Sequence, residues 1–278
     1  MQRCRSFKYQ PSVTSARLYN KCVSFKDHFS SLAPAYARYR PTYPPELAAH
    51  LASVAPSRAL ALDLATGNGQ PAIDLALHFD QVLASDASAR QLAEAIAQPQ
   101  VQYLRHQAEC LPVKSGCADL IAVAQAAHWL NFDRFYAEAR RVLRPGGVVA
   151  VWTYGLFKTD PVISTAIEYF YHEVVGPYWP PERRYIEARY QTLPFPLVEL
   201  PAPAFEISAD WPLVDVINYL GTWSAVDRYR SQRGEDPLPE IAKRLATLWP
   251  DGGTRHLRWP LHLRAGRFYS ESSTPRPL

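Results

Sequence analysis

The stretch that decides the fold of this chain is LALDLATGNGQPA, residues 60–72. Its first half is a short apolar run, which is typical of a strand buried on both faces. Gly67 and Gly69 then allow a sharp bend and a close approach of the backbone to a ligand. Pro71 suits the first turn of a helix, because its missing N–H costs nothing there. A strand, a glycine turn and a helix start predict a nucleotide-type site, since free N–H groups at the helix start favour polar or anionic groups.

Two ligands are compatible with this turn. Gly67, Gly69 and Ala72 fit the dinucleotide fingerprint, and Asp86 follows at the spacing of a ribose-binding acid. The turn also resembles the S-adenosylmethionine (SAM) site, whose pattern is an acid followed by three glycines at alternate positions. Asp63 separates the two interpretations, because a carboxylate beside the turn repels a pyrophosphate but attracts the cationic ammonium of SAM. A tight turn with no ligand is the third alternative.

Length and composition bound the class of protein. A chain of 278 residues predicts one large α/β domain, or one domain with an inserted cap. The composition is 47% hydrophobic and 20% charged, as in globular proteins, and no apolar run is long enough to cross a membrane. Residues 1–27 are basic and lack a secretory apolar segment, so we expect a tail outside the fold and a cytoplasmic location.

Charge and cysteine usage exclude further classes. The net charge is only +4 and the arginines are mixed with acids, so the sequence does not favour a nucleic-acid partner. No two of the four cysteines have the C-x-x-C spacing, so we expect no metal site and reduced thiols; they are Cys4, Cys22, Cys110 and Cys117. We expect a small-molecule substrate and a monomer or homodimer.

Strands and helices alternate after the first turn. Strands are expected over residues 60–64, 82–85, 101–104, 119–124 and 148–152, and helices over residues 46–54, 71–79 and 132–143. This alternation predicts a doubly wound, mainly parallel sheet, in which ligands lie outside the carboxyl ends of the strands.

Two predicted strands end in residues with useful chemistry. Asp86 can accept both ribose hydroxyls, because a carboxylate is a pure acceptor; the alternative is an N-cap for a helix near Ser88. His128 and Trp129 follow the strand 119–124 and are predicted to lie near the reaction centre. A histidine that caps the next helix is the alternative there.

Several ordered motifs resemble those of class I SAM-dependent methyltransferases. They are Asp63-x-Ala65-x-Gly67-x-Gly69, Asp86, Ala108-Glu109, Gln125-x-x-His128-Trp129 and Leu143-x-x-x-Gly147. Over residues 28–155 the sequence most resembles the small-molecule "type 11" group, which includes trans-aconitate methyltransferase-like proteins. The resemblance implies SAM as the cofactor and a seven-stranded, mainly parallel Rossmann-like sheet that ends in an antiparallel hairpin.

The resemblance also implies a role for each matched residue. It places the methionyl end of SAM against Asp63, Ala65, Thr66, Gly67 and Gly69. It places the ribose at Asp86 and Ala87, the adenine at Ala108 and Glu109, and the sulfonium at Gln125 and His128. Arg40, with Tyr39 or Tyr43 (or Tyr36), would close over the SAM carboxylate or the substrate. Ala65 replaces the first glycine of the pattern; because φ > 0 strains alanine, we expect the backbone there to differ from the glycine form.

The remaining segments frame this core. Residues 28–45 are predicted as an N-terminal lid and residues 156–203, rich in aromatic side chains, as a cap insertion that begins with a helix over residues 161–175. By resemblance, strands over residues 205–209 and 258–263 form the final hairpin, with helices over residues 214–223 and 238–249 between them. Residues 271–278 are predicted as a tail.

Methyl transfer is an in-line displacement, so the enzyme mainly aligns a nucleophile and excludes water. A hydroxyl acceptor needs a base, whereas a carboxylate, thiol or amine needs little or none. His128 is the candidate base, since the ordinary histidine pKa is near neutrality. The candidate clamps for an acid substrate are Arg40, Arg183, Arg184 and Arg228. The alternatives are a lyase-type enzyme that cyclises or cleaves SAM itself, a non-catalytic SAM-binding protein, and a dehydrogenase.

Overall fold

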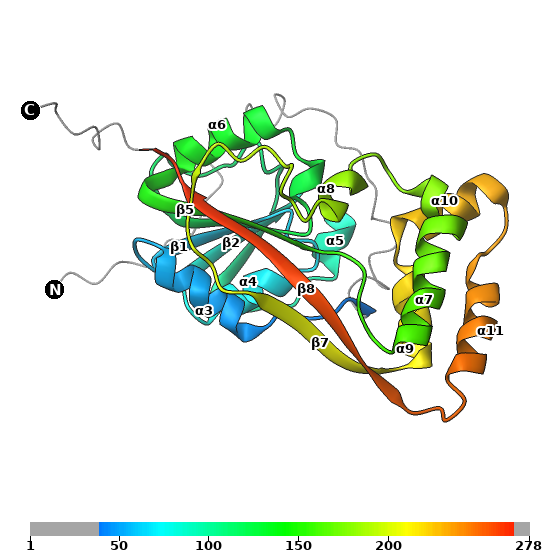
Figure 1. Cartoon of the computed structure of the whole chain (residues 1–278). Helices are drawn as coiled ribbons and strands as arrows, with labels where there is room; N and C mark the ends of the chain where they lie inside the picture. The colour runs from blue at the N-terminus through cyan, green and yellow to red at the C-terminus, as the bar shows by residue number, and fades with distance from the viewer. Residues whose placement is uncertain (1–38, 270–278) are drawn as a thin grey trace, which may run out of the picture.

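The computed structural model describes residues 39–269, in which eight strands form one twisted sheet (Figure 1). The strand order is β3-β2-β1-β4-β5-β8-β6, and β7 pairs with β8 beside this path. The strands are β1 (Leu60–Leu64), β2 (Gln81–Asp86), β3 (Val101–Arg105), β4 (Ala118–Ala124), β5 (Leu143–Tyr154), β6 (Val198–Glu199), β7 (Phe205–Pro212) and β8 (Thr254–Arg267). Strands β1 to β5 are parallel, and β8 is antiparallel to β5. The predicted doubly wound fold is confirmed, with the two-residue β6 raising the expected seven strands to eight.

The helices cover both faces of the sheet and build a lobe at one end. They are α3 (Pro45–Val54), α4 (Gln70–Ala76), α5 (Ala89–Ala93), α6 (Phe132–Val142), α7 (Pro161–Tyr169), α8 (Arg183–Glu187), α9 (Leu213–Gly221), α10 (Ser224–Arg233) and α11 (Leu238–Leu248). Figure 1 shows α3 and α4 on one face and α6 on the other. An apolar core layer lies on each face of the sheet, and successive strand residues point alternately into the two layers. Leu120 belongs to one layer and Ile121 to the other, and both are fully buried.

The connection from α6 to β5 differs from the sequence prediction. The predicted helix over residues 132–143 and the predicted strand over residues 148–152 leave a turn between them, but β5 already begins at Leu143, which pairs with Ala118. The register then shifts, and Leu120 pairs with Val148. Gly146, with φ +77°, lies within this irregular segment. Pairing with β4 therefore extends the strand through residues whose local pattern indicates a turn.

A long β-ribbon carries a helical lobe away from the sheet. The predicted final hairpin is confirmed, because Phe205 pairs with Leu261 and Ala209 with Leu257. At the far end of β7 and β8, α11 packs against α7 and α9 (Figure 1). The helix predicted over residues 161–175 is α7 continued by a π-helical turn, η3 (Phe170–Val174). Part of the predicted cap, residues 156–203, thus shares one lobe with helices from residues 213–248.

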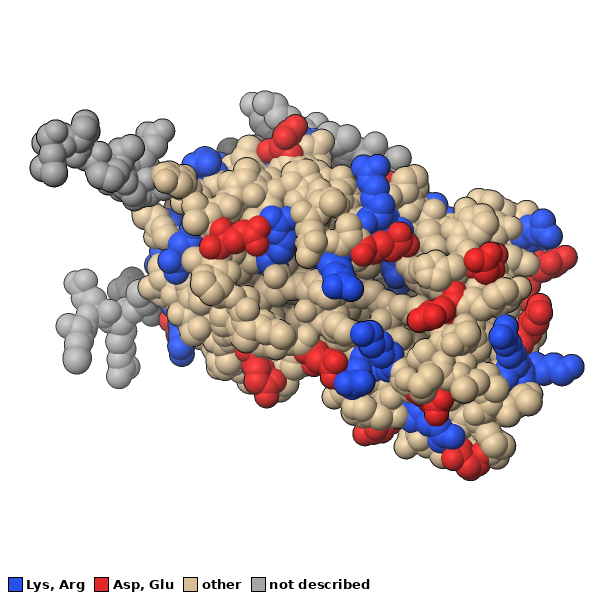
Figure 2. Space-filling model, in the orientation of Figure 1, with Lys and Arg blue, Asp and Glu red and all other residues tan. Residues whose placement is uncertain are grey.

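Several expectations fall on residues that lie outside the described range. These are the basic tail of residues 1–27, the first part of the lid including Tyr36, and the tail of residues 271–278. Within residues 39–269, no helix has both the length and the apolar character that crossing a membrane requires. Figure 2 shows acidic and basic side chains interspersed on the visible face, as the modest net charge indicates.

Candidate active site

A cavity of about 480 Å³ lies at the carboxyl ends of β1, β2, β4 and β5, where it meets the helical lobe. Its volume is within the range of about 300–1,000 Å³ that is typical of small-molecule sites. The predicted site residues that line it are Arg40, Tyr43, Ala65, Thr66, Gly67, Asp86, Ala87, Ala108, Glu109, Gln125 and His128. Three predicted site residues do not line it: Tyr39, Asp63 and Gly69. Tyr39 borders a second cavity, of about 360 Å³, which shares Arg40 with the first.

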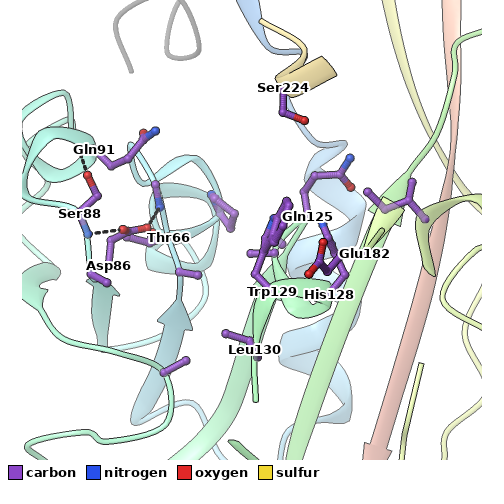
Figure 3. Close-up of a pocket in the computed structure, with 18 of the residues that line it drawn as sticks. Thr66, Asp86, Ser88, Gln91, Gln125, His128, Trp129, Leu130, Glu182 and Ser224 are labelled. Carbon is purple, nitrogen blue, oxygen red and sulfur yellow. Dashed lines mark hydrogen bonds between the residues drawn. The ribbon is translucent and has the colours of Figure 1, made fainter. Parts of the chain in front are cut away.

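We distinguish two walls of the larger cavity. The turn wall consists of Ala65, Gly67, Asp86, Ser88 and Glu109, and the cap wall consists of Trp179, Glu182, Arg183, Trp223 and Ser224. Figure 3 shows Asp86, Ser88 and Gln91 grouped on one side, with Glu182 and His128 opposite them and Ser224 toward the lobe. Sequence motifs predicted most of the turn wall. For the cap wall, the sequence offered only the aromatic density of residues 156–203 and Arg183 as one of four candidate clamps.

The glycine turn has three left-handed residues. Ala65 has φ +53°, Gly67 +60° and Gly69 +89°. The expectation that alanine at position 65 would avoid the glycine form is therefore wrong. Bonds on the next residue hold the conformation: the Thr66 N–H donates to the Ser85 carbonyl (3.0 Å) and the Thr66 hydroxyl donates to the Asp63 carboxylate. These bonds stabilise a backbone that costs roughly 1–2 kcal/mol for a residue with a Cβ.

Asp63 lies behind this turn and is fully buried. One carboxylate oxygen accepts the Thr66 hydroxyl, so the cavity meets the turn backbone and not this carboxylate. Burial raises the pKa of Asp63 to about 7, while the bond from Thr66 opposes the rise. The side chain is thus a support for the turn that takes up a proton readily.

Asp86 is held by two backbone N–H groups and borders the cavity (Figure 3). Its Oδ2 accepts from the Gly67 N–H (2.9 Å) and its Oδ1 accepts from the Ser88 N–H (2.8 Å). The alternative N-cap role belongs to Ser88, whose hydroxyl accepts from the Gln91 N–H at the start of α5. A carboxylate oxygen offers more than one lone pair, so Asp86 can still accept from ligand hydroxyls.

Gln125 follows β4 and has φ +53°. Its Nε2 donates to the Tyr154 carbonyl (2.9 Å), and its Oε1 accepts from the Thr153 hydroxyl (2.6 Å) and the Tyr154 N–H (2.9 Å). The side chain that was expected at the sulfonium therefore joins the ends of β4 and β5 while it lines the cavity.

His128 is buried in η2 (Ala127–Trp129) and lines the cavity. Its Nδ1 lies 2.8 Å from the Tyr190 hydroxyl. Burial, and secondarily the charge of Arg183, lower the pKa of His128 to about 3. His128 is therefore neutral at ordinary pH but only a weak base. The argument for His128 as the catalytic base rested on a pKa near neutrality, and this lowered pKa does not support it. The helix-cap alternative is wrong, because Asn131 caps α6.

Arg183 stands on the cap wall, at the first position of α8. Its Nε donates to the Tyr171 hydroxyl (2.7 Å), and its guanidinium carbon lies 4.2 Å from the centroid of the Trp179 ring. Within residues 39–269, no carboxylate forms an ion pair with Arg183, and the Glu182 side chain makes no hydrogen bond or ion pair. The cap wall thus presents one fixed cation and one carboxylate to the cavity.

The other candidate clamps differ from Arg183. Arg184 and Arg228 do not line the cavity. Arg40 lines it, but its Nη groups donate to the Tyr154 hydroxyl (3.3 Å) and the Thr222 carbonyl (3.2 Å). The sequence alone did not single out the cap-wall residues Glu182, Trp223 and Ser224, nor Tyr190 and Tyr219, since no motif marks them.

The chemistry of the turn wall fits the cofactor that the resemblance implies. Asp86 can accept ribose hydroxyls, and Ala108 and Leu130 provide apolar surface for a flat base beside Glu109. Glu109 is fixed because its Oε1 accepts from the Asn131 N–H (2.9 Å). In the described part of the chain, no group of three or more His, Cys, Asp or Glu side chains is arranged to hold a metal ion.

Known proteins resemble the chain in sequence and in structure. Residues 62–151 match a methyltransferase domain family. A Dictyostelium discoideum protein named as a methyltransferase is 35% identical over 227 residues, which are 80% of this chain and 86% of that protein. A Mycobacterium tuberculosis protein named as an uncharacterized methyltransferase is 39% identical over 126 residues, 45% of this chain and 51% of that protein.

A solved structure is similar to a longer part of the chain. It is described as a type II methyltransferase from Anaeromyxobacter dehalogenans and is 43% identical, with a TM-score of 0.77. The match covers 82% of this chain and 98% of that one. The similarity therefore reaches well beyond the segment that the domain family matches.

Proposed function

This chain belongs to the class I SAM-dependent methyltransferases, and from that membership we propose that its acceptor is a small carboxylic acid bound by Arg183. The resemblance of its motifs to the trans-aconitate methyltransferase-like group supports an acid acceptor. The predicted cytoplasmic location and the monomeric or dimeric state stay predictions from the sequence.

The observation that carries the proposal is the environment of Arg183. The guanidinium faces a cavity, is stacked on Trp179 and is fixed by Tyr171, yet it has no carboxylate partner among residues 39–269. A guanidinium in a fixed orientation matches the planar, two-oxygen geometry of a carboxylate. An acid acceptor supplies the partner that the described residues do not.

The state of His128 supports the same class of acceptor. A hydroxyl acceptor needs a base, but burial leaves His128 with a pKa of about 3, so it takes up protons poorly. A carboxylate is already ionised at neutral pH and needs no base. Bound SAM supplies a methyl group on a sulfonium. The acceptor oxygen forms a bond to that carbon while the carbon–sulfur bond breaks, its electron pair stays on sulfur, and no proton moves.

Two aromatic side chains of the cap wall, together with Tyr219 beside it, exclude water from this step. Trp223 and Tyr219 are buried in the lobe and border the cavity, and Trp179 covers Arg183. A drier cavity strengthens the attraction between the guanidinium and the acceptor carboxylate. Glu182 faces the same cavity, so we expect acids that also carry a hydroxyl or amino group to bind best.

An acceptor panel tests the proposal. Methyl-labelled SAM is incubated with the protein and small mono-, di- and tricarboxylic acids, plain or bearing hydroxyl or amino groups, each paired with its own amide. We expect the acids to be methylated at least about 100 times faster than their amides. Amides or alcohols that react as fast as the acids would remove the proposal. Methylthioadenosine formed from SAM alone would instead support the lyase alternative.

A further inference from the structure

One segment of the cap influences His128 from both of its ends. Helix α8 begins with Arg183, whose charge lowers the pKa of His128, and the turn that follows α8 ends in Tyr190, whose hydroxyl meets His128 Nδ1 at 2.8 Å. The α8 helix lies against η2, which carries His128. Tyr190, at the end of this segment, therefore bonds with the imidazole of a residue far away in the sequence.

The position of Tyr190 is strongly determined. Its side chain is fully buried, and its backbone has φ +60° directly after Arg189 with φ +55°. The Tyr190 N–H donates to the Tyr185 carbonyl (2.7 Å), and Arg264 Nη1 donates to the Tyr190 carbonyl (2.9 Å). Two consecutive left-handed residues that carry side chains cost free energy and persist only where the surroundings fix them. The hydroxyl is thus placed against His128 with little freedom.

The chemistry of the two groups indicates which partner donates. Burial raises the pKa of Tyr190, so the phenol stays protonated. A phenol O–H is a good hydrogen-bond donor and its oxygen a poor acceptor, whereas the bare nitrogen of a neutral imidazole is a good acceptor. A neutral imidazole has one acceptor nitrogen and one N–H. The hydrogen of Tyr190 then points to Nδ1, and the imidazole hydrogen is on Nε2.

We propose that Tyr190 is a positioning residue that fixes His128 as the Nε2–H tautomer, so that His128 presents a hydrogen-bond donor to the cavity and not a base. The inference deepens the proposed function and rests on it in one respect: an imidazole N–H suits a carboxylate oxygen, whereas it cannot deprotonate a hydroxyl. His128 and Arg183 then form two donors to one acid acceptor, the first neutral and the second charged.

The opposite assignment is compatible with the same 2.8 Å contact between His128 Nδ1 and the Tyr190 hydroxyl. In that arrangement Nδ1 would carry the imidazole hydrogen and donate to Tyr190, and Nε2 would be a bare acceptor. The two arrangements differ in one observable, the tautomer of His128.

The test is two-bond ¹H–¹⁵N correlation NMR on the full chain labelled with ¹⁵N-histidine. The signal of His128 is assigned by its loss in His128→Gln. We expect the pattern of the Nε2–H tautomer in the wild type, unchanged from pH 8 to pH 5. The pattern of the Nδ1–H tautomer, or of an imidazolium within this range, overturns the proposal.

A variant pair then tests the role of Tyr190. Tyr190→Phe keeps the buried ring and removes the hydroxyl, so the His128 signal should shift to a mixture of tautomers. Tyr185→Phe is the matched control, because its hydroxyl bonds with Arg184 and not with His128. An unchanged His128 signal in Tyr190→Phe overturns the proposal. If Tyr190→Phe does not fold, the wild-type spectrum alone still decides the tautomer.

These readouts do not depend on the identity of the acceptor. If the tautomer is Nε2–H but amides react as fast as acids, the proposed function is wrong and the role of Tyr190 stands. If the tautomer is Nδ1–H but acids are the preferred acceptors, the proposed function stands and the role of Tyr190 is wrong.

Discussion

The two walls of the cavity differ in how their polar groups are satisfied. On the turn wall, the Asp86 oxygens accept two backbone N–H groups and Glu109 accepts a third. On the cap wall, Arg183 is fixed by stacking and by one bond to Tyr171, but its charge has no carboxylate partner among the described residues, and neither has the charge of Glu182 a partner there. Buried or half-buried charges without partners are costly.

This difference separates two tasks. On the turn wall, hydrogen bonds within the protein fix the backbone in one conformation, which suits the binding of one constant cofactor. On the cap wall, the charges have no ion-pair partner among the described residues, which suits an acceptor whose own charged groups pair with them on binding. The variants below test this contrast, from the largest expected effect to the smallest.

Removal of the charge on the cap wall should have the largest effect. In Arg183→Met, the KM for the acid acceptor should rise by at least about 30-fold, since truncating one partner of a desolvated charge pair costs about 2–5 kcal/mol. SAM affinity should change little, because the turn wall is untouched. Steady-state kinetics and calorimetry measure the two quantities.

The neighbouring Arg184→Met is the control, since Arg184 is exposed and does not line the cavity. Equal KM values for both variants would contradict the assignment of Arg183, and a loss of SAM affinity in Arg183→Met would contradict the separation of the walls.

The buried support of the turn wall should make stability fall as pH rises. Burial raises the pKa of Asp63 from 3.8 to about 7 in the folded chain. Between about pH 4 and pH 7 the folded state thus holds the proton more firmly than the unfolded state, so the free energy of unfolding decreases with pH. The loss approaches about 4 kcal/mol at the top of this window, at about 1.4 kcal/mol per pKa unit.

The side chain introduced in Asp63→Asn cannot ionise, so the free energy of unfolding of this variant should not fall between pH 4 and pH 7. Relative to the wild type, the variant should therefore become more stable as the pH rises. Urea unfolding at several pH values measures the difference. Asp80→Asn, at an exposed acid, should run parallel to the wild type. A parallel course for Asp63→Asn as well would show that Asp63 has an ordinary pKa.

Loss of the Asp86 charge should weaken the cofactor site. Asp86→Asn replaces an acceptor-only group by one that also carries donors, opposite two backbone N–H groups and the predicted ribose hydroxyls. Hydrogen bonds to charged groups contribute about 1.5–3 kcal/mol, so the Kd for SAM should rise roughly 10- to 100-fold. Calorimetry measures the Kd, with Glu94→Gln as the exposed control. An unchanged Kd for SAM would contradict the prediction that Asp86 binds the ribose.

The smallest effect should come from the strained alanine of the turn. Ala65 has φ +53°, so Ala65→Gly relieves left-handed strain and should raise the free energy of unfolding by about 1 kcal/mol, net of the entropy of glycine. The control is Ala126→Gly, since Ala126 has φ −134° and gains nothing from glycine. A destabilised Ala65→Gly, measured by urea unfolding, would contradict the strained geometry.

The sequence predicted the turn wall because local rules act there. A buried strand, a glycine turn and a helix start follow each other within residues 60–72, and Asp86 and His128 follow later strands whose ends share one edge of the sheet. The alternation of strands and helices fixes that edge without knowledge of any side-chain contact.

The cap wall depends on contacts that no local pattern encodes. Four arginines were candidates for the clamp, and only the packing of α8 brings Arg183 to the cavity while Arg184 remains exposed. Tyr190 lies 62 residues from His128 in the sequence and reaches it through two left-handed residues. The geometry at Ala65 was mispredicted for a related reason, because hydrogen bonds of neighbouring residues outweigh a local preference.

The chemical bond formed in the product tests the central claim most directly. The protein is incubated with methyl-labelled SAM and the acid that reacts fastest in the panel, and the purified product is treated with mild alkali before mass spectrometry. An acid acceptor held by Arg183 predicts a methyl ester, from which alkali regenerates the acid and releases the label as methanol. A label that resists alkali because it is bonded to nitrogen, sulfur or a hydroxyl oxygen would contradict the account.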